Sequence, residues 1–166
     1  MSTSVNHAIC ESELNERFGQ PRPPHVVNKV KPRLDEWMTE FIGLSPFMVL
    51  ATANVNGACD ASPKGGPPGF VRVLDPETLL VPDYAGNNLF FGHRNILENP
   101  RVALLFFLPG EGWTVRVTGQ AQLVNDAESE RLAIKVTIEE CFSHCPKALA
   151  RSDLWNPAKH GRLPKV

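Results

Sequence analysis

The sequence has no long hydrophobic run, no excess of one charge and no export signal. Its apolar stretches stay well below the roughly 18 residues that a membrane span requires. The first thirty residues contain charges and prolines but not the apolar segment of a signal peptide. Lys and Arg total 17 and Asp and Glu total 18, so the chain shows no basic footprint for nucleic acid or an acidic membrane. We therefore expect a cytoplasmic protein whose four cysteines are reduced thiols.

Several motifs of well-known enzyme folds are missing as well. The chain has neither the G-x-G-x-x-G loop of dinucleotide-binding folds nor the G-x-x-x-x-G-K-[ST] phosphate loop. The G-x-S-x-G turn of α/β-hydrolases is absent, and strands do not alternate with helices as in a doubly wound sheet. What is present is an ordinary globular composition over 166 residues, 42% hydrophobic and with 15 prolines. It predicts one domain built from short elements.

The N-terminal part of the chain predicts two helices and a stiff connector. Residues 10–18 begin with acidic residues and end at a glycine, as helices do. Residues 32–43 place apolar side chains at helical spacing. The proline-rich segment 20–25 between them is either a polyproline ligand or a connector, and we favour the connector.

After residue 46 the chain changes to short strand-forming runs. Asn56-Gly57 predicts a hairpin turn after the first run, and the chain then returns over 58–64. Gly119 predicts a bulge or bend within a long alternating strand. Helices are expected at 88–97, at 126–133 and after residue 143. The six expected strands are 47–54, 70–74, 78–82, 102–109, 113–124 and 136–142, and the segment 58–64 folds back on the first of them.

This order of elements predicts an α+β fold that is mainly β. We expect about six strands in a small antiparallel barrel with helices packed outside it. The expected organisation is an N-terminal helix and connector over 1–30, a barrel domain over 31–156 and a C-terminal tail over 157–166.

Two clusters of polar residues are candidates for an anion site. Ser62-Pro63-Lys64-Gly65 brings a hydroxyl, an ammonium group and backbone N–H groups into one turn, although from this segment alone we favour a plain solvated turn. Asp83 to Asn88 lead into the predicted helix 88–97, where Asn87 or Asn88 either caps the helix or lets its free N–H groups face a phosphate. Arg94 lies seven residues after Asn87, on the same helical face.

The segment around Cys141, His144 and Cys145 resembles a metal site only superficially. A structural zinc site needs four ligands, and here a second pair of ligands is missing. His144 and Cys145 are adjacent, so they do not face each other as a nucleophile and its base would. We expect no metal.

The blocks DASPKGGPPGFVRVLD (60–75), LLVPDYAGNN (79–88), RNILENPRVALLF (94–106) and WTVRVTGQAQL (113–123) resemble the FMN-binding split-barrel superfamily typified by pyridoxamine 5′-phosphate oxidase. The tail CFSHCPKALARSDLW (141–155) is similar to an uncharacterised bacterial FMN-dependent subgroup. The resemblance covers about residues 30–156. It implies a six-stranded split barrel that forms a homodimer, with FMN at the subunit interface.

The resemblance also implies which residues hold the flavin. Ser62 and Lys64 are expected beside the cofactor, and the polar residues of the helix entry are expected to face the phosphate and the ribityl chain. Trp155 in the tail is expected to reach the flavin of the partner subunit. The expected cofactor-binding set is Ser62, Pro63, Lys64, Asp83, Asn87, Asn88, Arg94, Asn95 and Trp155.

This chain departs from the oxidase at two places. The oxidase has a Ser-Arg-Lys run at the entry to the phosphate helix, where this sequence has Gly86-Asn87-Asn88. The C-terminal substrate-binding signature of the oxidase is not matched either. The resemblance therefore does not imply vitamin B6 as the substrate, and the catalytic residues, the electron donor and a nicotinamide nucleotide as partner stay open.

Two classes of function are consistent with the sequence. The first is an FMN-dependent oxidoreductase that acts on a small molecule. The second is a non-catalytic carrier or sensor that binds a flavin, or that keeps the barrel and binds haem or a deazaflavin instead. An interaction domain without a cofactor is a third reading, which the polar set around Lys64 and Arg94 argues against.

Overall fold

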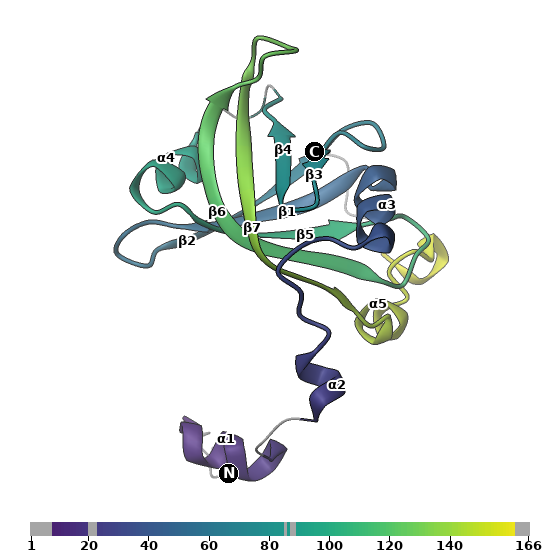
Figure 1. Cartoon of the computed structure of the whole chain (residues 1–166). Coiled ribbons are helices and arrows are strands. Elements are labelled where there is room, and N and C mark those ends of the chain that lie inside the picture. Colours follow the sequence, from purple (N-terminus) through teal and green to yellow (C-terminus); the bar gives the residue numbers. More distant parts are fainter. Residues whose placement is uncertain (1–7, 20–22, 85, 87–88, 162–166) are drawn as a thin grey trace.

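The computed structural model describes residues 8–19, 23–84, 86 and 89–161, with the side chains of 25 and 26 left aside. The described chain forms one antiparallel sheet of seven strands in the order β2-β1-β5-β6-β7-β4-β3 (Figure 1). The strands are β1 (Phe47–Ala53), β2 (Cys59–Gly65), β3 (Arg72–Asp75), β4 (Thr78–Pro82), β5 (Arg101–Phe107), β6 (Thr114–Asn125) and β7 (Leu132–His144). Because β2 and β3 are the two edges of the sheet and do not pair, the barrel is split.

The mainly β architecture and the split barrel are therefore confirmed, with seven strands rather than the predicted six. The difference arises around the β1–β2 hairpin, where Asn54 accepts backbone hydrogen bonds from Asn56 and Ala58 and so holds the turn. The returning segment then pairs along the whole of β1 as a full strand.

Helices lie around the barrel and at its ends (Figure 1). They are α1 (Glu11–Phe18), α2 (Pro24–Val27), α3 (Glu36–Leu44), α4 (Phe91–Glu98) and α5 (Lys147–Ser152), followed by the 3₁₀ turn η1 (Pro157–Lys159). Helix α1 lies apart from the barrel. No helix in the described part of the chain is long and apolar enough to cross a membrane.

Helix α3 closes one side of the core. It begins at Asp35, whose carboxylate accepts a hydrogen bond from the Met38 backbone N–H at 2.8 Å and so caps the helix. Met38, Phe41 and Ile42 point inward at helical spacing and are buried against the sheet. The barrel interior is filled by the alternate residues of β1, β5 and β6, including Leu50, Leu104 and Val117.

The long strand β6 bends where the sequence predicts it. The register of β6 against β7 shifts between Thr118 and Gly119, which is a β-bulge. A Cβ at Gly119 would lie 2.0 Å from the carbonyl oxygen of Thr137. Only glycine therefore fits at this close approach of two strands. The first half of β6 pairs with β5 on one side. On its other side β6 pairs with β7 along its length, and β7 in turn pairs with β4.

The outer side of strands β2, β1 and β5 is apolar and is not covered by a helix in the described chain. Residues that face each other across antiparallel strands lie on the same side of the sheet. Here β2, β1 and β5 present one such side, away from the core, with half-buried or exposed side chains. Its central members are Val49, Ala51, Ala61, Pro63, Ala103 and Leu105.

The segment 126–133, predicted as a helix, instead forms the turn between β6 and β7 over residues 126–131 and the first two residues of β7. The Asp126 carboxylate accepts hydrogen bonds from the Ser129 hydroxyl at 2.6 Å and from the Glu128 backbone N–H at 3.3 Å. Arg72 on β3 also donates to this carboxylate. Such local side-chain hydrogen bonds compete with helix formation, and the chain after the turn continues as strand β7.

Replacing Asp126 with alanine is expected to lower the melting temperature near pH 7 more than replacing Glu128 with alanine does. The hydrogen bond from Ser129, helped by Arg72, holds the pKa of Asp126 below its usual value. The stabilisation is therefore present above the ordinary carboxyl pKa of about 3.9 and is lost as the pH falls through the lowered pKa. Glu128 is 79% exposed and gives only a surface ion pair with Arg72. Equal losses for the two variants in a thermal melt would contradict this account.

Candidate functional site

Strand β2 presents its polar residues alternately on one side. Asp60, Ser62 and Lys64 are half-buried, whereas the residues between them are exposed. They pair with Thr52, Leu50 and Met48 of β1, which face the core. The period of two in a strand therefore places a carboxylate, a hydroxyl and an ammonium group in one row at the edge of the barrel.

The N-terminus of α4 lies over this row. A Cβ on Gly92, in the first turn of α4, would lie 3.7 Å from Asp60 Oδ2 and 3.8 Å from Thr52 Oγ1. The first hydrogen bond within the helix joins the Arg94 N–H to the Phe90 carbonyl at 2.9 Å, so the N–H groups of residues 91–93 have no acceptor inside the helix. Phe90 is the N-cap, in a left-handed conformation with φ 55°, and provides no side-chain cap.

These elements surround a pocket of about 140 Å³. Strand β2 forms one wall, the start of α4 forms another, and the segment after β4 forms a third. Its lining residues are Leu50, Asp60, Ser62, Lys64, Asp83, Tyr84, Gly86, Leu89, Phe90, Phe91, Gly92 and His93.

A half-buried histidine with a buried ring nitrogen lies in this wall. His93 Nε2 is 3.3 Å from Asp83 Oδ1, within ion-pair range when the imidazole is protonated. The two groups are not aligned for a hydrogen bond, and no other described group satisfies this buried nitrogen. Buried polar atoms are nearly always paired in folded proteins. A ligand in the pocket that donates or accepts a hydrogen bond would supply the partner that His93 Nε2 lacks.

Lys64, which lines the pocket, also has no partner among the described residues. No ion pair or hydrogen bond joins Lys64 or Ser62 to another residue in the described chain. An ammonium group, a hydroxyl and three open helix N–H groups are suited to an anionic oxygen ligand, since each donates a hydrogen bond. The carboxylates of Asp60 and Asp83 line the same pocket and accept hydrogen bonds, which suits hydroxyl groups on the same ligand.

The structure brings together part of the set predicted from the sequence. Ser62, Lys64 and Asp83 line the pocket. Asn87 and Asn88 lie outside the described residues. Pro63 is exposed on the opposite side of β2, which as an edge strand tolerates its missing N–H.

The two predicted helix residues have different surroundings. Asn95 donates a hydrogen bond from Nδ2 to Thr52 Oγ1 at 2.9 Å and so fastens α4 to β1. Arg94 is exposed and forms no ion pair with the described residues. Neither residue lines the pocket. Helix α4 begins at Phe91 rather than at the predicted residue 88, so Arg94 stands in its first turn.

Trp155 lies far from this pocket within one chain. Its indole N–H donates a hydrogen bond to the Glu111 carbonyl at 2.7 Å, in the connection between β5 and β6. Figure 1 shows α4 and α5 at opposite sides of the barrel, with the tail on the α5 side. Contact between Trp155 and a ligand in such a pocket would therefore need a second copy of the chain.

The cysteine and histidine segment shows no metal site. No group of three or more potential metal ligands is found among the described residues. Cys141 is buried, and burial raises the pKa of its thiol to about 11, which leaves it protonated and unreactive. His144 packs edge-on against the Phe142 ring, and burial, together with Lys29 and Arg116, lowers its pKa.

Sequence reasoning missed three contributors to the pocket. Asp60 lies in the returning segment 58–64, in which only Ser62 to Lys64 were singled out from the sequence, although its period of two with Ser62 and Lys64 places it on the same strand face. His93 and Gly92 follow from the position of α4, because its first turn lies across β1 and β2. That packing depends on contacts distant in the sequence and has no local signal.

A family model described as pyridoxamine 5′-phosphate oxidase matches residues 34–160, most of the chain. No curated protein matches the sequence significantly.

Solved structures share the fold. HupZ from Group A Streptococcus superposes with a TM-score of 0.53 at 16% identity, covering 66% of this chain and 93% of that chain. LDB0262 from Lactobacillus delbrueckii has a TM-score of 0.53 at 23% identity, covering 68% and 95%. Rv2991 from Mycobacterium tuberculosis has a TM-score of 0.51 at 16% identity, covering 80% and 93%. At these identities the likeness establishes the split-barrel fold.

Proposed function

The chain belongs to the pyridoxamine 5′-phosphate oxidase family, and on that basis we propose that it is an FMN-dependent oxidoreductase that works as a homodimer. The observation that carries the proposal is the unpartnered Lys64 in a pocket under the open N-terminus of α4. Residues 31–156 would form the flavin-binding domain, and the substrate would be a small molecule.

The residues of the pocket fit a flavin mononucleotide by their chemistry. Its phosphate is largely dianionic near pH 7 and suits Lys64 together with the free N–H groups of α4. Its ribityl chain carries hydroxyl groups that suit Asp60, Asp83 and the unsatisfied His93 Nε2. Arg94, exposed in the first turn of α4, adds a second positive charge near the phosphate.

The size of the pocket supports a dimer. Pockets for ligands of this size usually enclose about 300–1,000 Å³, whereas this one measures about 140 Å³. One chain therefore offers room for only part of an FMN molecule, and a second chain would enclose the rest. The uncovered apolar face of β1, β2 and β5 is suited to that contact, because such faces mark interaction surfaces.

Bound FMN would supply hydride or electron transfer, and the protein would bind and orient it. The set of nine residues predicted from the sequence remains our proposal for the binding residues. Of these, Trp155 would act from the partner subunit. Within one chain its hydrogen bond to Glu111 holds it on the α5 side of the barrel, away from the pocket under α4.

Comparing FMN with riboflavin tests the phosphate part of the proposal. Both share the ring and the ribityl chain, so any difference in affinity comes from the phosphate. Titration of ligand-free protein, followed by flavin fluorescence, is expected to show about 30-fold tighter binding of FMN, because charge-assisted hydrogen bonds contribute about 2 kcal/mol. Equal affinities for the two ligands would exclude the pocket under α4 as a phosphate site.

A further inference from the structure

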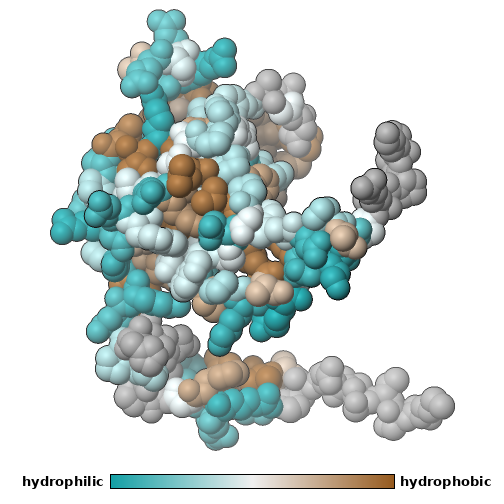
Figure 2. Space-filling view, turned by 90° about the vertical axis from the view of Figure 1, so that its right-hand side faces the viewer, coloured by the Kyte–Doolittle hydropathy of each residue, from teal (hydrophilic) through white to brown (hydrophobic). Residues whose placement is uncertain are grey.

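A second cavity, of about 580 Å³, lies at the other side of the barrel from the pocket under α4. It is formed by α3, the connection between β5 and β6, and the end of β7. This is the side that Figure 2 turns to the viewer, where apolar surface lies among hydrophilic residues. Nothing in the proposed flavin site uses this cavity.

Aromatic rings form much of its wall. Trp37 and Trp113 meet edge to face with their ring centroids 6.3 Å apart. Phe41 packs behind Trp37 at 5.3 Å. The two tryptophans remain 45% and 41% exposed, although indole rings are usually well buried. Large aromatic surface is therefore available to a ligand in this cavity.

The charged residues that line the cavity are acidic. Glu40 on α3 and Glu111 in the β5–β6 connection are both lining residues, and no Lys, Arg or His is among the described residues that line it. Neither carboxylate forms an ion pair with a described residue. Two uncompensated carboxylates beside π faces favour a positive charge, because each ring presents its negative face to a cation.

We propose that this cavity binds an organic cation that carries an apolar or aromatic group. Trp37 and Trp113 would pack against the apolar part and attract the cationic centre, and Glu40 and Glu111 would provide the opposite charge. The volume admits a molecule larger than a simple ammonium ion. The site does not depend on flavin binding.

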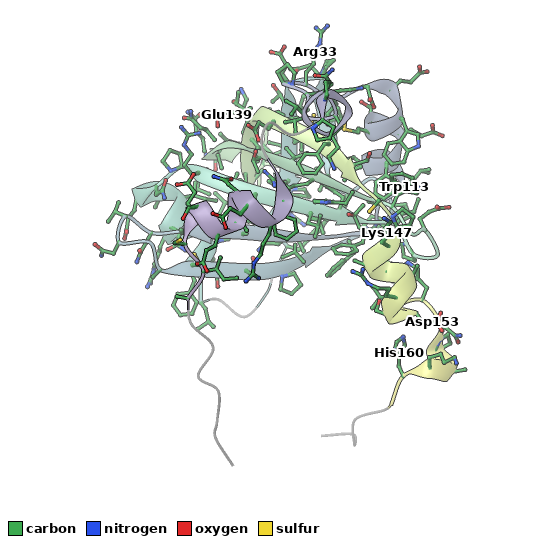
Figure 3. The ribbon with its side chains drawn as sticks, turned by 90° about the horizontal axis from the view of Figure 1, so that it is seen from below. Arg33, Trp113, Glu139, Lys147, Asp153 and His160 are labelled. Carbon is green, nitrogen blue, oxygen red and sulfur yellow. The ribbon has the colours of Figure 1, made fainter. Side chains whose placement is uncertain are left out.

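A positive charge on α5 would compete with a bound cation. Figure 3 shows Lys147, at the start of α5, beside Trp113. Pro146 packs so closely below Gly112 that a Cβ there would lie 2.6 Å from it, which holds α5 against this connection. If Lys147 determined the selectivity, the cavity would prefer an anion. An anionic probe of the same size therefore discriminates between the two outcomes.

The probes are benzyltrimethylammonium, benzyl alcohol and phenylacetate, which share a phenyl ring and differ in charge. All three tryptophans of the sequence lie on this side, since Trp155 is hydrogen-bonded to Glu111 at 2.7 Å. Indole fluorescence of the full-length protein as purified, checked by calorimetry, reports binding. We expect benzyltrimethylammonium to bind about tenfold more tightly than benzyl alcohol, and phenylacetate to bind most weakly.

Conservative variants test the assignment of residues. Glu111→Gln and Glu40→Gln are each expected to weaken binding of the cation by about fivefold and to leave benzyl alcohol unchanged. Glu98→Gln, at the end of α4 on the other side of the barrel, is the matched control and is expected to change neither. Thermal melts verify that each variant is folded.

Three results would overturn the proposal. They are an affinity for phenylacetate or benzyl alcohol equal to or above that for the cation, no detectable binding of the cation at millimolar concentration, and cation binding that both glutamine variants leave intact. Because none of these readouts involves FMN, failure here is distinct from failure of the flavin proposal.

Discussion

Replacing Lys64 with glutamate is expected to weaken FMN binding by about 100-fold or more. The ammonium group is half-buried in the pocket under α4 and has no partner in the described chain. The substitution removes its charge-assisted hydrogen bond to the phosphate and places a third carboxylate beside Asp60 and Asp83. Like charges near a phosphate dianion add repulsion to the lost attraction.

The measurement is a fluorescence titration of ligand-free protein with FMN at fixed salt. Lys135→Glu is the matched control, because Lys135 is an exposed lysine on a strand of the same sheet that lies outside the pocket. It undergoes the same charge change and is expected to keep the affinity within about twofold. If Lys64→Glu bound FMN as well as the control does, the phosphate would not lie in this pocket.

Replacing Val49 with glutamate is expected to convert the proposed dimer to a monomer and to remove FMN with it. Val49 lies on β1, the middle strand of the apolar sheet face, opposite Pro63 and Leu105 in register. An interface across this face would bury the new carboxylate without a partner, which costs several kcal/mol per subunit and acts twice in a symmetric dimer. In a single chain Val49 is only half-buried, so the barrel itself is expected to fold.

Sedimentation at micromolar concentration, with the FMN content measured in the same samples, tests this prediction. Val55→Glu is the control, because Val55 is 66% exposed at the tip of the β1–β2 hairpin, away from the face. It is expected to stay dimeric and yellow. A monomeric Val49→Glu variant that kept its FMN would show that one chain suffices. A wild-type monomer would remove the shared site altogether.

The strands were the most predictable part of this fold, because alternation and turn residues are local. The hairpin at Asn56-Gly57, the long strand β6 and its bend at Gly119 all follow from period and glycine placement. The helix predicted over 126–133 was wrong because the Asp126 carboxylate, with Ser129 and a distant Arg72, holds that segment as a turn. The sequence separation of Arg72 hides that contact.

Part of the site was also predictable, because the ends of strands have local sequence signals. Ser62, Lys64 and Asp83 were placed by the edges of predicted strands, and the structure brings them to one pocket. Asp60, Gly92 and His93 join them only because α4 packs across β1 and β2. Its first turn starts three residues later than expected, after a left-handed Phe90, which no local pattern indicates.

The most direct test of the account is the absorption spectrum of the purified protein, followed by release of the ligand and determination of its mass. We predict the two absorption bands of an oxidised flavin and the mass of FMN in the extract, lost together in the Lys64→Glu variant. A Soret band, or the mass of a deazaflavin, would contradict FMN and favour another ligand of the barrel. A colourless protein that also fails to bind added FMN would contradict the flavin function altogether.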